Sequence, residues 1–74
     1  MPAPTSKALG RAVRALRDER GMSQEDLAHR ADISVQYLSG IEGGHRNPTW
    51  DVLTRLADAL NLSISQLAVR AESE

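Results

Sequence analysis

The chain has 74 residues, of which 41% are apolar and only 3% aromatic, and its formal net charge is −1. It contains no cysteine, which excludes disulfides and thiolate metal sites, and its longest apolar run, at 67–69, is far shorter than the ~20 residues of a membrane span or the core of a secretion signal. These features predict one small domain over residues 1–74, with an ordered core of about 6–70, in the reducing cytoplasm.

Charge is distributed unevenly along the chain. Residues 1–17 carry four basic side chains and no acid, whereas residues 51–74 carry two bases and four acids. A strongly positive net charge, the usual mark of a nucleic-acid binder, is absent. Composition alone therefore neither supports nor excludes DNA as a partner, and the motifs must decide.

The first predicted helix covers about residues 6–20. It begins after Pro4, near Thr5 or Ser6, and Gly21 supplies the left-handed residue that ends many helices. Its apolar residues recur at i, i+4 and i+7: Leu9, Val13 and Leu16. This spacing gives the helix one apolar face.

One local pattern recurs four times and predicts four further helix starts. An apolar residue or proline precedes Ser or Thr, and leucine follows four positions after the hydroxyl residue. Such hydroxyls accept hydrogen bonds from the first-turn N–H groups, and the preceding residue packs on the leucine. The expected N-caps are Ser23, Ser34, Thr49 and Ser63. Asp26 and Gln66 complete capping boxes at the first and last of them.

These starts predict helices of about 24–31, 35–42, 50–60 and 64–70, with frayed tails at Met1–Pro4 and Glu72–Glu74. No stretch of the sequence alternates apolar and polar residues as a half-buried strand does. The predicted fold class is therefore all-α, a compact domain of five helices.

The second and third helices are separated by only four residues, 31–34, which is the spacing of a helix-turn-helix. Ala28 has the small side chain needed where the two helices cross, and Leu38 and Ile41 are the apolar contacts of the third helix. Asp32 falls in the turn, where a left-handed backbone is expected and Asp tolerates it better than most residues.

Three segments carry a family resemblance: GMSQEDLA at 21–28, YLSGIEGG at 37–44 and RNPT at 46–49. Together they resemble the Cro/C1 (XRE-like) family of bacterial and phage DNA-binding regulators. The resemblance implies a lambda-repressor-like fold and transcription regulation, for example as a repressor, and the chain is most similar to the small controller proteins of restriction-modification systems. It departs from the family at Asp32, where Gly is usual, and at Gly40, which lacks a side chain that often contacts a base.

Helical geometry selects the outward side chains of the third helix. At about 100° per residue, Gln36 points almost directly away from the core and Ser39 lies about 130° from it. The amide of Gln36 is suited to adenine in the major groove, Val35 to a thymine methyl group, and Ser39 and Ser34 to polar contacts. A solvated polar residue is the plain alternative for Gln36. The helix has no Arg or Lys, so we expect few base contacts and some readout of DNA shape.

Flanking residues extend the expected DNA contact. Tyr37, at about 70° from the core direction, suits the core edge and a DNA contact equally. The resemblance implies that Gln24 and the free N–H groups at the start of the second helix hold a phosphate, and that Arg46 and Asn47, after the third helix, contact the DNA backbone. The alternatives are a plain capping role for Gln24 and a freely solvated side chain for Arg46. Arg11 on the first helix is either a further phosphate contact or a solvated side chain.

No residue set predicts catalysis, so we expect no enzyme activity, cofactor, metal or small-molecule ligand. His29 and His45 are far apart and have no cysteine partners. The carboxylates Glu25 and Asp26 suit helix capping and the helix dipole better than acid–base chemistry.

The apolar residues are more than one core needs. A sufficient core is Leu9, Val13, Leu16, Leu27, Leu38, Ile41, Leu53, Leu56 and Leu60. Apolar residues near the C-terminus are then in surplus, and Ile64 and Ala68, four apart on one face, together with Trp50, are the predicted homodimer interface.

The sequence therefore predicts a nucleoid-associated regulator that binds a roughly palindromic double-stranded operator as a homodimer, and excludes or assists RNA polymerase by occupying that site. Two alternatives stay open: a protein-interaction module that keeps the helical fold, and an antitoxin whose main partner is another protein. A stoichiometric heterologous protein in a pull-down would favour either alternative.

Overall fold

The computed structural model describes residues 5–74, which form five helices and no strand. The helices are α1 (Ser6–Glu19), α2 (Gln24–Ala31), α3 (Val35–Glu42), α4 (Trp50–Ala59) and α5 (Ile64–Ser73). The predicted all-α fold of five helices is confirmed. The tail Met1–Pro4, predicted to fray, lies outside the described residues.

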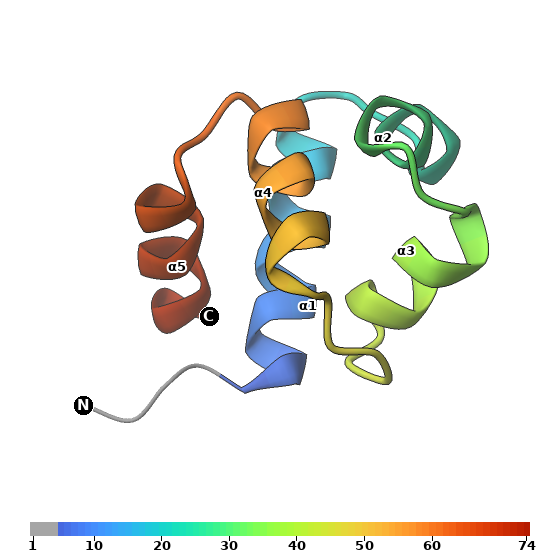
Figure 1. The fold of residues 1–74 in the computed structure, drawn as a ribbon. Coiled ribbons are helices and arrows are strands. Elements are labelled where there is room, and N and C mark those ends of the chain that lie inside the picture. The colour runs from blue at the N-terminus through green and yellow to red at the C-terminus, as the bar shows by residue number, and fades with distance from the viewer. Residues whose placement is uncertain (1–4) are drawn as a thin grey trace.

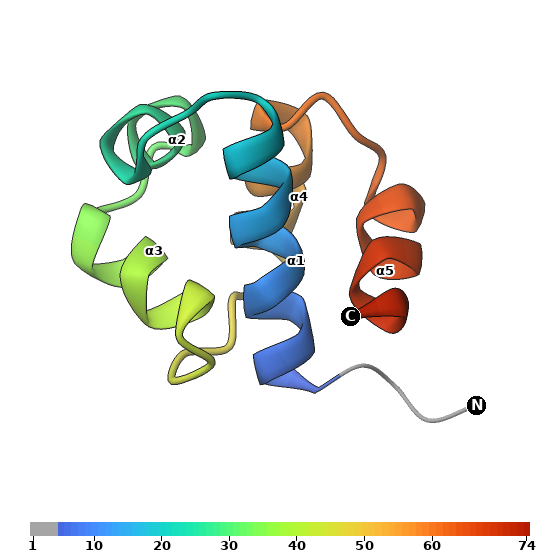
Figure 2. The same ribbon diagram turned by 180° about the vertical axis from the view of Figure 1, so that it is seen from behind.

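Helices α1 and α4 connect two sides of the molecule. Both occupy the middle of the view in Figure 1, with α2 and α3 to one side and α5 to the other, and the reverse view in Figure 2 shows the same arrangement. Helix α1 packs against α3 and α5, and α4 packs against α2 and α5. The helix-turn-helix and the last helix therefore lie on opposite sides of a molecule of 33 × 23 × 21 Å.

Helices α2 to α5 begin directly after their four predicted N-caps, and α1 begins after Thr5, close to its predicted start. The side-chain oxygen accepts a hydrogen bond from the N–H three residues further on at Thr5, Ser23, Ser34, Thr49 and Ser63. Both predicted capping boxes are present, because Asp26 and Gln66 accept hydrogen bonds from the backbone N–H of their N-caps. A single cap of this kind stabilises a helix by about 1 kcal/mol.

Four of the helices also end in the same way. A residue with positive φ lies just beyond each of α1 to α4: Gly21, Asp32, Gly44 and Asn61. The next residue then donates its N–H to the carbonyl five positions back, as from Met22 to Arg17 at 3.1 Å. The left-handed residues at Gly21 and Asp32 are confirmed predictions, whereas those at Gly44 and Asn61 were not predicted.

The core is built from the predicted leucines together with small residues. Seven of the predicted core residues are buried: Val13, Leu16, Leu27, Leu38, Ile41, Leu56 and Leu60. Alanines are buried among them: Ala12, Ala28, Ala31, Ala57 and Ala71. Leu9 and Leu53, predicted as core, are only half-buried, because they line a cavity beside α5.

Helix α5 continues beyond its predicted end near residue 70. The expectation that Glu72–Glu74 frays is wrong for Glu72 and Ser73, which are helical. Ala71 is buried, and Arg70 forms ion pairs with Glu19 of α1 and with Glu74. These contacts with α1 hold the last turn in place.

Candidate nucleic-acid interface

The turn between α2 and α3 is held from two directions. Locally, Asp32 is left-handed at φ 57°, and the N–H of Ile33 donates to the carbonyl of Ala28 at 3.0 Å. From α4, the guanidinium of Arg55 donates to the carbonyls of Ala31 and Asp32 at 3.1 and 2.9 Å. The angle between the two helices is therefore fixed by the turn itself and by a side chain from outside it.

Because Gly10 has no side chain, the backbone of α1 lies directly against the backbone at the end of α3. A Cβ atom at this position would lie 2.3 Å from the carbonyl oxygen of Ile41 and 2.6 Å from that of Glu42. Real Cβ atoms do not come so close, so any other residue here would push α3 away. Leu38 and Ile41 are fully buried beside this contact. The position of α3 therefore depends on a glycine in a different helix.

A buried ion pair joins the same two helices. The Arg17 guanidinium donates to the Glu42 carboxylate from Nε at 2.8 Å and from Nη2 at 3.1 Å, and it also donates to the carbonyl of Met22 at 2.8 Å. The two charged side chains are 11% and 5% exposed. The pKa of Arg17 is raised, chiefly by its hydrogen bond to Glu42 and despite the opposing effect of burial.

Gln24 forms a hydrogen bond with this ion pair. It is half-buried, and its Nε2 donates to Oε1 of Glu42 at 3.0 Å. A glutamine amide carries two hydrogens, so one is left for the phosphate contact that the resemblance implies. That contact stays a prediction. The network of Arg17, Glu42 and Gln24 was not predicted, since the paired charges lie 25 residues apart and local spacing does not show which helices meet.

The predicted reading residues of α3 face outward as helical geometry requires. Gln36 and Ser39 are exposed, whereas Val35 and Tyr37 are half-buried and pack against the edge of the core. Ser34 uses its Oγ to accept from the N–H of Tyr37 at 3.0 Å, so its first role is the cap of α3. The structure brings these residues onto one surface, and their contacts with bases stay predictions.

The loop after α3 returns onto the same surface. The guanidinium carbon of Arg46 lies 5.9 Å from the centroid of the Tyr37 ring, within the range of a cation–π contact. Tyr37 therefore lies at the core edge, one of its two predicted positions, and its ring supports a cation there.

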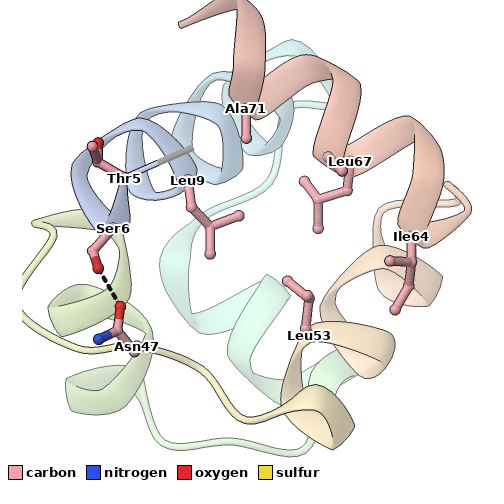
Figure 3. Close-up of a pocket in the computed structure, with 9 residues that line it drawn as sticks. Thr5, Ser6, Leu9, Asn47, Leu53, Ile64, Leu67 and Ala71 are labelled. Carbon is pink, nitrogen blue, oxygen red and sulfur yellow. Dashed lines mark hydrogen bonds between the residues drawn. The ribbon is translucent and has the colours of Figure 1, made fainter. Parts of the chain in front are cut away.

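The structure turns Asn47 away from this surface. Ser6 donates a hydrogen bond from its Oγ to Oδ1 of Asn47, and both residues line the cavity beside α5, as Figure 3 shows. Arg11 is exposed on α1, next to Gly10. DNA contacts of Asn47 and Arg11 stay predictions, and the structure does not place either side chain beside Gln36.

The surface of α3 and its loop is suited to a polyanion. Glu42 is the only acidic residue within residues 33–47, and its carboxylate is buried against Arg17. Arg46 is exposed, and the stem of exposed Lys7 lies against the loop at Gly44. No exposed carboxylate on this segment would repel the phosphates of DNA.

Two of the three predicted dimer residues lie on the opposite side of the molecule, beside α5. Ile64 and Ala68 line an apolar cavity of about 160 Å³ between α1, α4 and α5, and Figure 3 shows Ile64 at its rim with Leu53 and Leu67. Trp50 does not line this cavity, but it is 71% exposed at the start of α4. The structure thus brings two of the three predicted interface residues together.

Residues 5–74 contain no cluster of three or more His, Asp or Glu side chains that could hold a metal ion. Within the same range, no helix has the length and apolar character needed to cross a lipid bilayer.

Comparison with known proteins identifies close relatives. A family profile described as helix-turn-helix matches residues 13–67. The HTH-type transcriptional regulator y4dJ of Sinorhizobium fredii is 44% identical over 61 residues, which cover 82% of this chain and 79% of that protein. With several other curated relatives, the aligned part is only 43% or 44% of their length.

Solved structures with this fold include restriction-modification controllers. The controller protein C.AhdI from Aeromonas hydrophila has a TM-score of 0.82 and 34% identity, with 84% of this chain and 94% of that chain covered. C.Esp1396I, solved bound to a 19 base pair DNA duplex, has a TM-score of 0.83 and 29% identity, with 92% and 91% covered.

Proposed function

This chain belongs to the Cro/C1-type helix-turn-helix family of transcriptional regulators, and we propose that it binds a roughly palindromic operator as a homodimer with α3 in the major groove. The observation that carries this proposal is the outer surface of α3. Gln36 and Ser39 are exposed on it, while the one nearby carboxylate is paired in the interior. Such a surface can approach phosphates and still offer amide and hydroxyl groups to base edges.

Dimerisation follows from the amount of DNA that one copy can read. One recognition helix contacts about four or five base pairs, too few to select one site in a bacterial genome, whereas two copies a helical turn apart about double the specific free energy. Ile64 and Ala68 beside the apolar cavity support the α5 side as the dimer interface, with exposed Trp50 as a further contact.

Regulation by occupancy fits a protein of this kind. We propose that the bound dimer excludes or assists RNA polymerase, without catalysis, and that it acts in the cytoplasm on chromosomal DNA. The likeness to C.AhdI over 94% of that chain supports a controller role in a restriction-modification system. Neighbouring genes for a DNA methyltransferase and an endonuclease would support that role, and a toxin-like neighbour would contradict it.

Selection from a random pool of duplexes tests DNA binding. We expect an enriched, near two-fold symmetric sequence whose affinity falls with salt by a log–log slope of about −0.9 per phosphate contact. The proposal is contradicted if no sequence is enriched, or if the affinity for DNA is the same at low and at physiological salt concentration.

Sedimentation tests the dimer. Ile64→Asp should give a folded monomer at micromolar concentration with much weaker operator binding, because the carboxylate would be buried between subunits. Val69→Asp is the matched control, since Val69 lies on the same helix, is 62% exposed and does not line the cavity. A wild-type monomer, or an Ile64→Asp variant that remains dimeric, contradicts this interface.

A further inference from the structure

Arg46 occupies the space that a side chain at Gly40 would take. A Cβ atom at Gly40 would lie 2.6 Å from Cγ and 3.4 Å from Cβ of Arg46. The stem of Arg46 therefore runs directly over the backbone of α3. Gly40 is needed here for its lack of a side chain, not for an unusual backbone angle, since its φ is not positive.

The backbone holds Arg46 in this place. The N–H groups of His45 and Arg46 both donate to the carbonyl of Gly40, at 2.8 and 3.1 Å. The loop is thus attached to the same residue over which the arginine stem passes. Arg46 is a fixed part of the α3 surface, although it does not belong to the helix.

The stem leads the charged group toward the N-terminal part of α3. Tyr37 lies one turn before Gly40 on the same side of the helix, and the Arg46 guanidinium lies 5.9 Å from the centre of its ring. Gln36, four residues before Gly40, is a neighbour on the same stripe and is exposed. The amide and the guanidinium therefore belong to one outward surface.

The guanidinium of Arg46 is not buried in the protein. Arg46 is exposed, and within residues 5–74 its guanidinium lies over the Tyr37 ring and not in an ion pair. Its planar pair of N–H groups is thus available to a partner, and the Tyr37 ring supports its orientation.

We infer that Arg46 reads a guanine in each half-site, by donating to O6 and N7 in the major groove, and so supplies the base-reading arginine that α3 itself lacks. This inference rests on the proposed DNA-binding function. It assigns Arg46 to specificity, whereas the family resemblance suggests a contact with the DNA backbone. Bidentate contact with guanine needs a guanidinium, and a phosphate contact needs only a positive charge.

The test uses the full chain and the duplex enriched by wild-type protein, with each base pair varied in turn. Arg46→Lys should keep the salt slope but lose about tenfold discrimination at one G·C pair per half-site. Gly40→Ala should lose discrimination at the same pair, because the new methyl group displaces the arginine stem, with no fall in melting temperature. His45→Ala, which leaves the backbone bonds in place, should keep the wild-type profile.

The outcomes separate this inference from the function on which it rests. If wild-type protein enriches a sequence and Arg46→Lys reads it with an unchanged profile, Arg46 is a phosphate contact and the inference is wrong. If Arg46→Lys loses discrimination but Gly40→Ala keeps it, the positioning by Gly40 is wrong. If wild-type protein enriches no sequence, the proposed function itself fails.

Discussion

The two sides of this molecule are built by different kinds of contact. On the side of α2 and α3, a buried ion pair, a glycine contact and several hydrogen bonds fix the recognition helix, and the outer surface is polar. On the side of α5, buried Leu67 and Ala71 and the ion pair of Arg70 with Glu19 hold the helix, and an apolar cavity remains. The first surface suits a hydrated, charged partner, and the second suits the apolar surface of another protein.

This difference predicts how substitutions will act. On the side of α2 and α3, changes to the anchoring groups should alter stability and DNA binding together, because the same contacts fix the fold and orient α3. On the side of α5, changes at the cavity should alter assembly first. The following predictions test this comparison, mainly on the side of α2 and α3, from the largest effect to the smallest.

The largest effect is expected at the buried ion pair. Glu42→Ala removes the main partner of the Arg17 guanidinium, which is 11% exposed and keeps only the exposed Asp18 and the Met22 carbonyl, so the free energy of unfolding should fall by about 2–3 kcal/mol. Glu42→Gln is the matched control and should lose less, because its oxygen still accepts from Arg17. Urea unfolding measures both. A loss below about 1 kcal/mol for Glu42→Ala would mean that the pair contributes no more than a surface pair.

The next effect is expected at Gly10. A methyl group here would collide with the end of α3, so Gly10→Ala should lower the free energy of unfolding by about 2 kcal/mol. The Gly10→Ala molecules that remain folded should also bind DNA more weakly than wild-type protein. Gly21→Ala is the control, because its φ of 66° makes alanine costly by about 1 kcal/mol although no atom lies within 4 Å. Its folded fraction should bind DNA normally. A Gly10→Ala variant as stable as wild type would show that the α1–α3 contact adapts.

Gln36→Ala should act on recognition alone. Its side chain is exposed, so stability should not change, whereas binding to the enriched operator should weaken by about 1–3 kcal/mol per half-site and non-specific binding should remain. Fluorescence anisotropy on specific and random duplexes measures the difference. Ser65→Ala, exposed on α5, serves as the control. An unchanged operator preference would make Gln36 a solvated residue.

The smallest effect is expected with acid. The pKa of Asp26 lies below its ordinary 3.8, chiefly because the Ser23 N–H donates to it, and the pKa of Glu19 lies below 4.5 through its bond with Arg70. A lowered pKa stabilises the fold above the ordinary value, and this contribution is lost as the pH falls through the lowered one. The melting temperature should therefore decline below about pH 4, and less steeply in Asp26→Asn. A melting temperature that holds or rises there contradicts this account.

The sequence predicts those parts of the structure that depend on neighbouring residues. Caps at Ser23 and Ser63 and the left-handed Asp32 each follow from a few consecutive residues, and all are confirmed. The contact of Gly10 with Ile41 could not be predicted in this way, because it depends on how distant helices approach. The same reason explains the other contacts that the sequence did not reveal: Arg17 with Glu42, and Gly40 with Arg46.

The end of α5 shows this limit most simply. The charged and polar residues after Arg70 suggest a frayed tail, yet Ala71 is buried and Arg70 is paired with Glu19. Burial at Ala71 depends on α1, more than fifty residues earlier in the chain. Helix ends are therefore predictable where a local stop such as Gly21 exists, and not where tertiary contact extends the helix.

The most direct test of the central claim is a titration of ¹⁵N-labelled protein with the enriched duplex, followed through its backbone amide signals. We expect the largest shifts at residues 34–40 and at Arg46, with the amides of 64–71 nearly unchanged. Largest shifts at 64–71, or none at physiological salt, would contradict DNA recognition by the outer surface of α3.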